Sequence, residues 1–194
     1  MKPDLLCLAS SSPYRKQQLK QLGLPFECRS PSVDETPLPD EDAEKIAHRL
    51  SIAKAEEIAA QIDKGIVIGS DQCASCDGQL LHKPLTVAKA IEQLQWCTGK
   101  TATFYTGLCV IDTISETRRT AMVPTRATFR ALSNEKIQCY VKREPALNCA
   151  GGFKMEGLGI SLFASIHSED PSALIGLPMI ALVSLLQSLG IEIL

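Results

Sequence analysis

Short apolar runs and longer amphipathic stretches alternate along this chain. The apolar runs predict strands at 5–9, 26–28, 66–68, 101–111 and 117–130. The amphipathic stretches, most of which begin beside Ser, Thr or Pro, predict helices at 14–22, 43–60, 86–96, 133–142 and 178–189. This order predicts an α/β fold in which helices flank a mixed sheet.

Turn signals separate these predicted elements. Asp77-Gly78 predicts a hairpin, residues 31–42 form a Pro-rich acidic loop, and residues 150–159 form a Gly-rich loop. There are no internal repeats or low-complexity tracts. A chain of 194 residues fits one domain, with or without two lobes, and is long enough to bury a core.

The composition excludes several classes of function. The formal net charge is -2, so no basic field is available to hold a long nucleic acid, and any bound phosphate must rely on a few local cations. No apolar stretch approaches the roughly 20 residues of a membrane span, and the first residues do not form a signal peptide. We therefore expect a cytoplasmic protein that does not contact a membrane.

Eight cysteines are scattered through the sequence, and only Cys73 and Cys76 form a C-x-x-C pair. A structural zinc site needs a second pair of similar spacing, which the sequence lacks. A thioredoxin-like pair begins a helix, whereas this pair is predicted to follow a strand and precede a hairpin. Buried free thiols are therefore the favoured interpretation, with a redox protein as an alternative.

Two charged residues fall on the apolar faces of predicted helices. Lys54 continues a stripe formed by Leu50 and Ile58, each four residues away. Arg15 lies four residues before Leu19, on the inward face of the first helical turn. Either side chain alone could snorkel, with a buried stem and a charged head in water. Together they indicate cations directed into a shared cleft.

Polar residues at two predicted element ends suggest chemistry. Ser10-Ser11-Ser12-Pro13 precedes a helix and offers hydroxyls, backbone N–H groups and a helix dipole to a phosphate, although a simple N-cap explains it equally well. Asp71 follows the apolar run 66–68, a frequent catalytic position in open α/β sheets. A turn or capping aspartate is the alternative there. By default, Glu35 and Lys83 are solvated surface charges.

These segments, in this order, resemble the Maf family of nucleotide pyrophosphatases. The matching segments are 8–16, 33–35, 54–55, 69–72, 83–84, 103–107, 149–157 and 175–178. The resemblance implies a fold similar to that of the inosine triphosphate pyrophosphatases, with residues 1–194 forming one two-lobed domain around a cleft. It also implies a homodimer.

Three positions resemble the branch of the family that hydrolyses 7-methyl-GTP. Tyr14, Gln72 and Glu156 stand where the branch acting on dTTP and UTP has Arg, Thr and Gln. Methylation at N7 makes guanine cationic, and the face of Tyr14 would attract it by about 0.5–2 kcal/mol. Glu156 would accept hydrogen bonds from N1–H and the exocyclic amine. The chain departs from the family at Lys16 and His82, where relatives often have Arg and Gly.

The resemblance also implies roles in catalysis. Asp71 would accept a proton from the water that attacks the α-phosphate. Asp71 and Glu35 would coordinate a divalent cation, expected to be Mg²⁺, either directly or through water. The residues implied to hold phosphate oxygens are Ser10, Arg15, Lys54 and Lys83.

Three alternatives remain at this point. The same chemistry would serve dTTP, UTP or other non-standard nucleotides. A second alternative is a nucleotide-binding regulator of septum formation, which would bind nucleotide without turnover. The third is the redox protein that uses Cys73 and Cys76.

Overall fold

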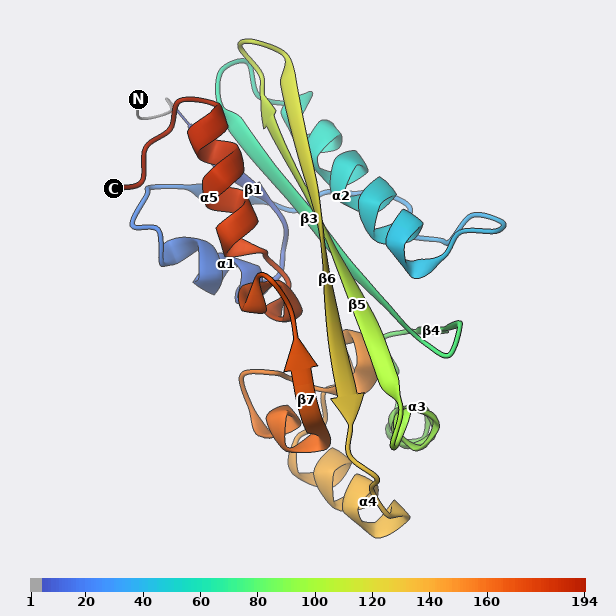
Figure 1. Cartoon of the computed structure of the whole chain (residues 1–194). Coiled ribbons are helices and arrows are strands. Elements are labelled where there is room, and N and C mark those ends of the chain that lie inside the picture. Colours follow the sequence, from blue (N-terminus) through green and yellow to red (C-terminus); the bar gives the residue numbers. More distant parts are fainter. Residues whose placement is uncertain (1–4) are drawn as a thin grey trace.

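The computed structural model describes residues 5–194, whose strands form one seven-stranded mixed sheet (Figure 1). The strands are β1 (Leu6–Ala9), β2 (Glu27–Arg29), β3 (Ile66–Cys76), β4 (Gln79–Leu81), β5 (Thr101–Asp112), β6 (Thr117–Phe129) and β7 (Phe163–His167). Their order is β2-β1-β3-β5-β6-β7, with β4 paired to β3. β1 runs parallel to β2 and β3, and the other pairs are antiparallel. The predicted mixed α/β fold is confirmed.

Five helices pack around this sheet close to the predicted positions. They are α1 (Pro13–Lys20), α2 (Ala43–Ala59), α3 (Val87–Cys97), α4 (Asn134–Arg143) and α5 (Met179–Ser188). Short 3₁₀ helices occupy η1 (Ala150–Gly152), η2 (Leu158–Leu162) and η3 (Pro171–Ile175). The residues whose side chains cap the first four helices are Ser12, Asp42, Thr86 and Ser133. Each accepts a hydrogen bond from the backbone N–H three residues later, which explains why the predicted helix starts are accurate.

The long strand β3 corrects the prediction of a strand confined to 66–68. It continues to Cys76 and pairs with β5 along its whole length. Asp71 therefore lies in the middle of a strand, and the Cys73/Cys76 pair lies inside that strand rather than after it. Polar residues persist there because some have partners within the fold: the buried Ser70 hydroxyl donates to the Gly107 carbonyl at 2.8 Å. β7, which pairs with β6, was not predicted.

The long strands carry separate apolar clusters towards their two ends. Figure 1 shows α1, α2 and α5 beside one end and α3 and α4 beside the other. Near Ile66, alternate residues of the sheet pack against α1 and α5 on one face and against α2 on the other. Towards Cys76, the cluster includes α3, α4 and four phenylalanines, which are Phe104, Phe129, Phe153 and Phe163. Strands β3 and β5 contribute to both ends, so they connect the two groups of helices.

Two glycines allow α2 to lie unusually close to the sheet. A β-carbon at Gly69 would lie 2.3 Å from the backbone oxygen of Ser51, and one at Gly107 would lie 2.4 Å from that of Ala47. Any larger residue would force the helix backbone outwards. This close approach brings Lys54 of α2 against β3.

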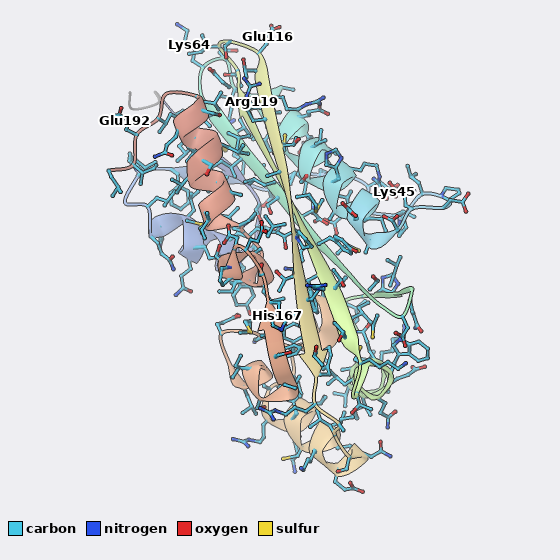
Figure 2. All side chains as sticks on the ribbon, in the orientation of Figure 1. Lys45, Lys64, Glu116, Arg119, His167 and Glu192 are labelled. Atoms are coloured by element: carbon cyan, nitrogen blue, oxygen red, sulfur yellow. The ribbon has the colours of Figure 1, made fainter. Side chains whose placement is uncertain are left out.

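Charged side chains of both signs lie around the outside of the sheet. Figure 2 shows Lys64, Glu116 and Arg119 near the turn between β5 and β6, while Lys45 projects from α2. None of the helices in residues 5–194 is both long and apolar enough to cross a membrane.

Candidate active site

All nine residues selected from the sequence line one cavity of about 790 Å³. They are Ser10, Tyr14, Arg15, Glu35, Lys54, Asp71, Gln72, Lys83 and Glu156. They come from the β1–α1 turn, α1, the loop before α2, α2, β3, the segment after β4, and the loop after η1. The fold therefore brings together side chains that are far apart in the sequence.

Lys54 connects two carboxylates at the centre of the cavity wall. Its Nζ donates to Asp71 Oδ1 at 2.6 Å and lies 2.5 Å from Glu35 Oε1. The Lys54 side chain is 8% exposed, so its head is paired inside the protein rather than snorkelling into water. Asp71 Oδ2 accepts no hydrogen bond from residues 5–194 and is the oxygen left for a water molecule or a ligand.

Glu35 is the more exposed of the two carboxylates that contact Lys54, with about half of its side chain accessible to solvent. Its Oε2 lies 3.8 Å from Lys83 Nζ. Burial tends to raise the pKa of the Glu35 carboxyl, but the hydrogen bond and charge of Lys54, together with Lys83 and Arg15, lower it overall. Glu35 is therefore an ionised carboxylate in a predominantly cationic setting.

Arg15 presents part of its guanidinium to the cavity. Its Nε donates to the Gly176 carbonyl at 2.7 Å, while its two Nη groups make no hydrogen bond to the described residues. Burial lowers the pKa of Arg15, and the Asp71 and Glu35 carboxylates oppose that effect. The side chain is thus oriented by the backbone, with donors left over for an anion.

The serine turn before α1 is used partly for structure. Ser12 is the N-cap of α1 and accepts from Arg15 N at 3.4 Å, as the simpler interpretation of this turn required. Ser10 Oγ accepts from Ser12 N at 3.1 Å. No acceptor within residues 5–194 takes the Ser10 hydroxyl proton, so Ser10 retains a donor towards the cavity.

The side-chain amide nitrogen of Gln72 donates hydrogen bonds to other groups of the protein. Nε2 donates to Thr106 Oγ1 at 3.1 Å and to the carbonyls of Ala173 and Leu174 at 2.9 and 3.2 Å. Thr106 Oγ1 itself donates to Ala173 O, so it accepts from Gln72 and fixes the orientation of the amide. Gln72 Oε1 accepts no hydrogen bond from the described residues, which leaves Gln72 to face a ligand as an acceptor.

Tyr14 and Glu156 line the cavity from segments far apart in the sequence. Glu156 is exposed, in the loop that follows η1, where Gly151 and Gly152 both have positive φ. The Tyr14 side chain interacts with Lys154 and raises the pKa of that ammonium. Lys154 lines the same cavity but was given no role from the sequence. The available signal was its position inside the matching segment 149–157.

The residues that line the cavity suit a metal that arrives with a polyphosphate. Among residues 5–194, no group of three or more His, Cys, Asp or Glu side chains is arranged to hold a metal ion. Glu35 and Asp71 nevertheless provide two carboxylates at one place. Mg²⁺ is commonly bound by one or two carboxylates together with substrate phosphates. The donor set fits that pattern.

The Cys73/Cys76 pair has the wrong geometry for redox chemistry. Residues three apart in a continuous strand point to opposite faces of the sheet, so these two sulfurs do not face each other. Burial, with a smaller effect of Asp71, raises the pKa of the Cys73 thiol to about 11. All eight cysteines are free, and four are fully buried. The structure favours the interpretation of this pair as ordinary thiols.

Comparisons with known proteins agree on one family. A family model described as "Maf-like protein" matches residues 5–189. The chain is 49% identical to a "7-methyl-GTP pyrophosphatase" of Pseudomonas aeruginosa, over 98% of this chain and 99% of the relative. It is 45% identical to a protein of the same name from Nitrosococcus oceani, over 99% and 96% of the two chains.

Among solved structures, the chain is similar to "The structure of the Staphylococcus aureus Ham1 protein". That likeness covers 82% of this chain and 80% of the other, at 14% identity and a TM-score of 0.49.

Proposed function

Because the chain belongs to the Maf-like protein family, we propose that it hydrolyses 7-methyl-GTP to 7-methyl-GMP and pyrophosphate. One structural observation carries the proposal: Asp71 lies against Lys54 in a cavity that Arg15 and Lys83 also line. An acid surrounded by several cations suits a reaction in which negative charge builds up on phosphate oxygens. The names of the relatives support the choice of substrate.

The proposed reaction begins with a water molecule held by Asp71. The water oxygen attacks the α-phosphorus, and its proton passes to the free Oδ2 of Asp71. The bond between the α-phosphorus and the oxygen bridging to the β-phosphorus breaks, and pyrophosphate leaves with that oxygen and the bonding electrons. Lys54 holds Oδ1 and thereby fixes the direction in which Oδ2 points.

Three cations lie around the proposed triphosphate site. Both Nη groups of Arg15 lack a hydrogen-bond partner among residues 5–194, and Lys83, which also lines the cavity, has a largely exposed side chain. Lys54 is paired with Glu35 and Asp71, so it stabilises the anionic site before substrate enters. The Ser10 hydroxyl adds a neutral donor to this set.

Glu35 would hold a divalent cation, most simply Mg²⁺, together with phosphate oxygens, and Asp71 would contact the cation through its bound water. When bound, the cation would neutralise part of the polyphosphate charge. These carboxylates also retain Lys54 between them, so the protein balances charge at this point without depending on the cation alone.

Two acceptors and an aromatic ring support selectivity for a methylated guanine. Glu156 and Gln72 Oε1 match the N–H donors on the edge of guanine, and the Tyr14 ring suits its positive charge. Thymine and uracil present one ring N–H and no cation. Both features therefore disfavour dTTP and UTP, in agreement with the names of the relatives.

A substrate panel tests the function directly. Released pyrophosphate would be measured with 7-methyl-GTP, GTP, dTTP and UTP, with Mg²⁺ and again with excess EDTA. We expect the highest kcat/KM with 7-methyl-GTP and loss of turnover in EDTA. A preference for dTTP or UTP would overturn the choice of base. Tight binding without any pyrophosphate would favour a regulator instead.

The proposal includes a cytoplasmic homodimer. A reducing compartment suits a protein whose cysteines are all thiols. Sedimentation at micromolar concentration tests the dimer, for which a single species of 21.0 kDa would be the contrary result.

A further inference from the structure

We propose that Asp170 is a positioning residue for this site, because it fixes the backbone segment that orients Arg15 and Gln72. Asp170 is not among the residues that line the cavity. The inference rests on the proposed function only in that part of its effect is measured on that reaction. Its physical basis is a set of hydrogen bonds that runs from a buried carboxylate to the side chains of the site.

Asp170 is a buried charge that the proposed mechanism does not use. It is 3% exposed, and within residues 5–194 no cation forms a salt bridge with it. Four donors satisfy it instead. Oδ2 accepts from Ile180 N and Ala181 N at 2.7 and 3.1 Å, while Oδ1 accepts from Ser172 N at 3.2 Å and from Ser172 Oγ. The carboxylate thus joins the start of η3 to the first turn of α5, where a negative charge also meets the positive end of the helix dipole.

The segment held between these two attachments supplies carbonyl groups to the site. Gly176 O accepts from Arg15 Nε at 2.7 Å and from Ser70 Oγ at 3.0 Å. Ala173 O accepts from Gln72 Nε2 at 2.9 Å and from Thr106 Oγ1 at 3.0 Å. The segment therefore orients Arg15, to which we assign phosphate binding, and Gln72, to which we assign base selection.

The segment has little freedom to compensate for a change at Asp170. Gly176 has φ +126°, which L side chains rarely adopt, and a β-carbon there would lie 3.3 Å from Arg15 Nε. Gln18 of α1 donates to Ser172 O and Leu177 O at 2.8 and 3.1 Å. The path of residues 171–178 is therefore set by Asp170, Gln18 and one special glycine, and of these only Asp170 is charged.

Asp170→Asn tests the inference by replacing one carboxylate oxygen with an NH₂ group. That group would face N–H or O–H donors already in place, so part of the segment must move. Misplacing a substrate-positioning group by about 1 Å can cost roughly 100-fold in rate. We expect kcat/KM for 7-methyl-GTP to fall about 10- to 100-fold at a temperature where the variant is folded.

A double-mutant cycle separates positioning from general stability. The quantity compared is the ratio of kcat/KM for 7-methyl-GTP to that for dTTP, measured in Asp170→Asn, in Gln72→Met and in the double variant. If Asp170 acts through Gln72, the double variant will change this ratio by less than the product of the two single changes. Ser133→Ala, which removes the N-cap of α4, is the matched control: it should lower Tm without changing that ratio. Wild-type kcat/KM in Asp170→Asn, or fully multiplicative effects in the cycle, would overturn the inference.

A readout without substrate keeps the two proposals distinguishable. In NMR spectra of the free protein, the Arg15 Nε–H and Gln72 side-chain amide signals should shift in Asp170→Asn and stay in place in Ser133→Ala. Unchanged signals in the folded Asp170→Asn protein would refute positioning. If Asp170→Asn does not fold, Ser172→Ala, which removes one donor to the same carboxylate, replaces it with the same expectations. Absence of pyrophosphate release by the wild type would refute the proposed function alone.

Discussion

Asp71 shows how a single side chain combines several requirements in this site. It is 8% exposed and its Oδ1 receives the Lys54 ammonium, so neither charge is left alone in the interior. Its second oxygen accepts no hydrogen bond from the part of the chain that the structure describes. A carboxylate held on one side and open on the other is well suited to accept a proton from a positioned water.

Replacing Asp71 with Asn should abolish most turnover while preserving the shape of the side chain. General-base catalysis typically contributes about 10²–10⁴-fold, and we expect kcat with 7-methyl-GTP to fall within that range. Pyrophosphate release would be measured alongside circular dichroism to confirm folding. Wild-type kcat in a folded Asp71→Asn enzyme would remove Asp71 from the proposed mechanism.

The base preference should respond to two residues changed together. Glu156→Gln with Gln72→Thr exchanges two of the three distinguishing side chains for those of the dTTP/UTP branch. The change removes the anionic acceptor that complements a cationic guanine, so the ratio of kcat/KM for 7-methyl-GTP to that for UTP should fall at least about tenfold. Lys16→Ala, on the exposed face of α1, is a suitable control. An unchanged ratio would contradict the roles assigned to Glu156 and Gln72.

Much of the site could be predicted residue by residue, although for different reasons. The helical period alone placed Lys54 on the buried stripe of α2, because neighbours four residues apart share a face. It could not show that Arg15 meets Gly176, since these residues are 161 positions apart and join only through tertiary contacts. The family resemblance implied that Arg15 holds phosphate oxygens, but it did not predict this contact with Gly176.

At the scale of elements, the position of α2 determines how close Lys54 comes to Asp71. The helix backbone rests on Gly69 and Gly107, and Lys54 lies between Ser51 and Ala55, the two residues nearest to Gly69. A methyl group added at Gly69 would therefore change the distance between Lys54 and Asp71 as well as the packing of α2 on the sheet.

Gly69→Ala should therefore lower both stability and activity. Overpacking typically costs about 1–3 kcal/mol, which corresponds to a fall in Tm of roughly 2–12 °C for a chain of this size. We also expect a lower kcat, because the helix must retreat from β3. Thr120→Ala, at an exposed position on β6, is the control and should change neither quantity much. Unchanged Tm and kcat in Gly69→Ala would show that α2 does not set this distance.

Helices were easier to predict than strands, because their caps are local signals. Ser12, Asp42, Thr86 and Ser133 each mark a helix start by a side-chain bond to a nearby N–H. β3 was predicted too short because polar residues interrupt its apolar pattern where it faces the cavity. β7 was missed because it has only five residues, whose extended conformation depends on pairing with β6.

For the whole molecule, the charge cluster links the stability of the fold to pH. The pKa of Glu35 is lowered from its ordinary value of 4.5, since Lys54 and its neighbours outweigh burial. A carboxyl with a lowered pKa stabilises the folded state at pH values above its unfolded pKa. That contribution is lost as the pH falls through the folded pKa.

Comparison of the wild type with Glu35→Gln would isolate this contribution. The wild type should be the more stable protein near pH 7, and the difference in Tm should shrink as the pH falls below about 4.5. Thermal denaturation from about pH 3 to about pH 7 provides the measurement. Because Glu35 is half exposed, the difference should also diminish in high salt. If the difference in Tm instead widened in acid, the form of Glu35 that pairs with Lys54 would not be the ionised carboxylate.

The continuous ladder between β3 and β5 limits how this enzyme can accommodate ligands. Strand β3, which supplies Asp71, Gln72 and Cys73 to the cavity, stays in register with β5 from Ile66 opposite Asp112 to Cys76 opposite Ala102. A hinge motion between the two ends of these strands would have to break backbone hydrogen bonds in the middle of the sheet. Entry and release of ligands should instead depend on the coil segment 144–149, which contributes residues to the cavity lining and carries none of the nine selected side chains. Motion of this segment would gate turnover while the spacing of the charged groups is preserved.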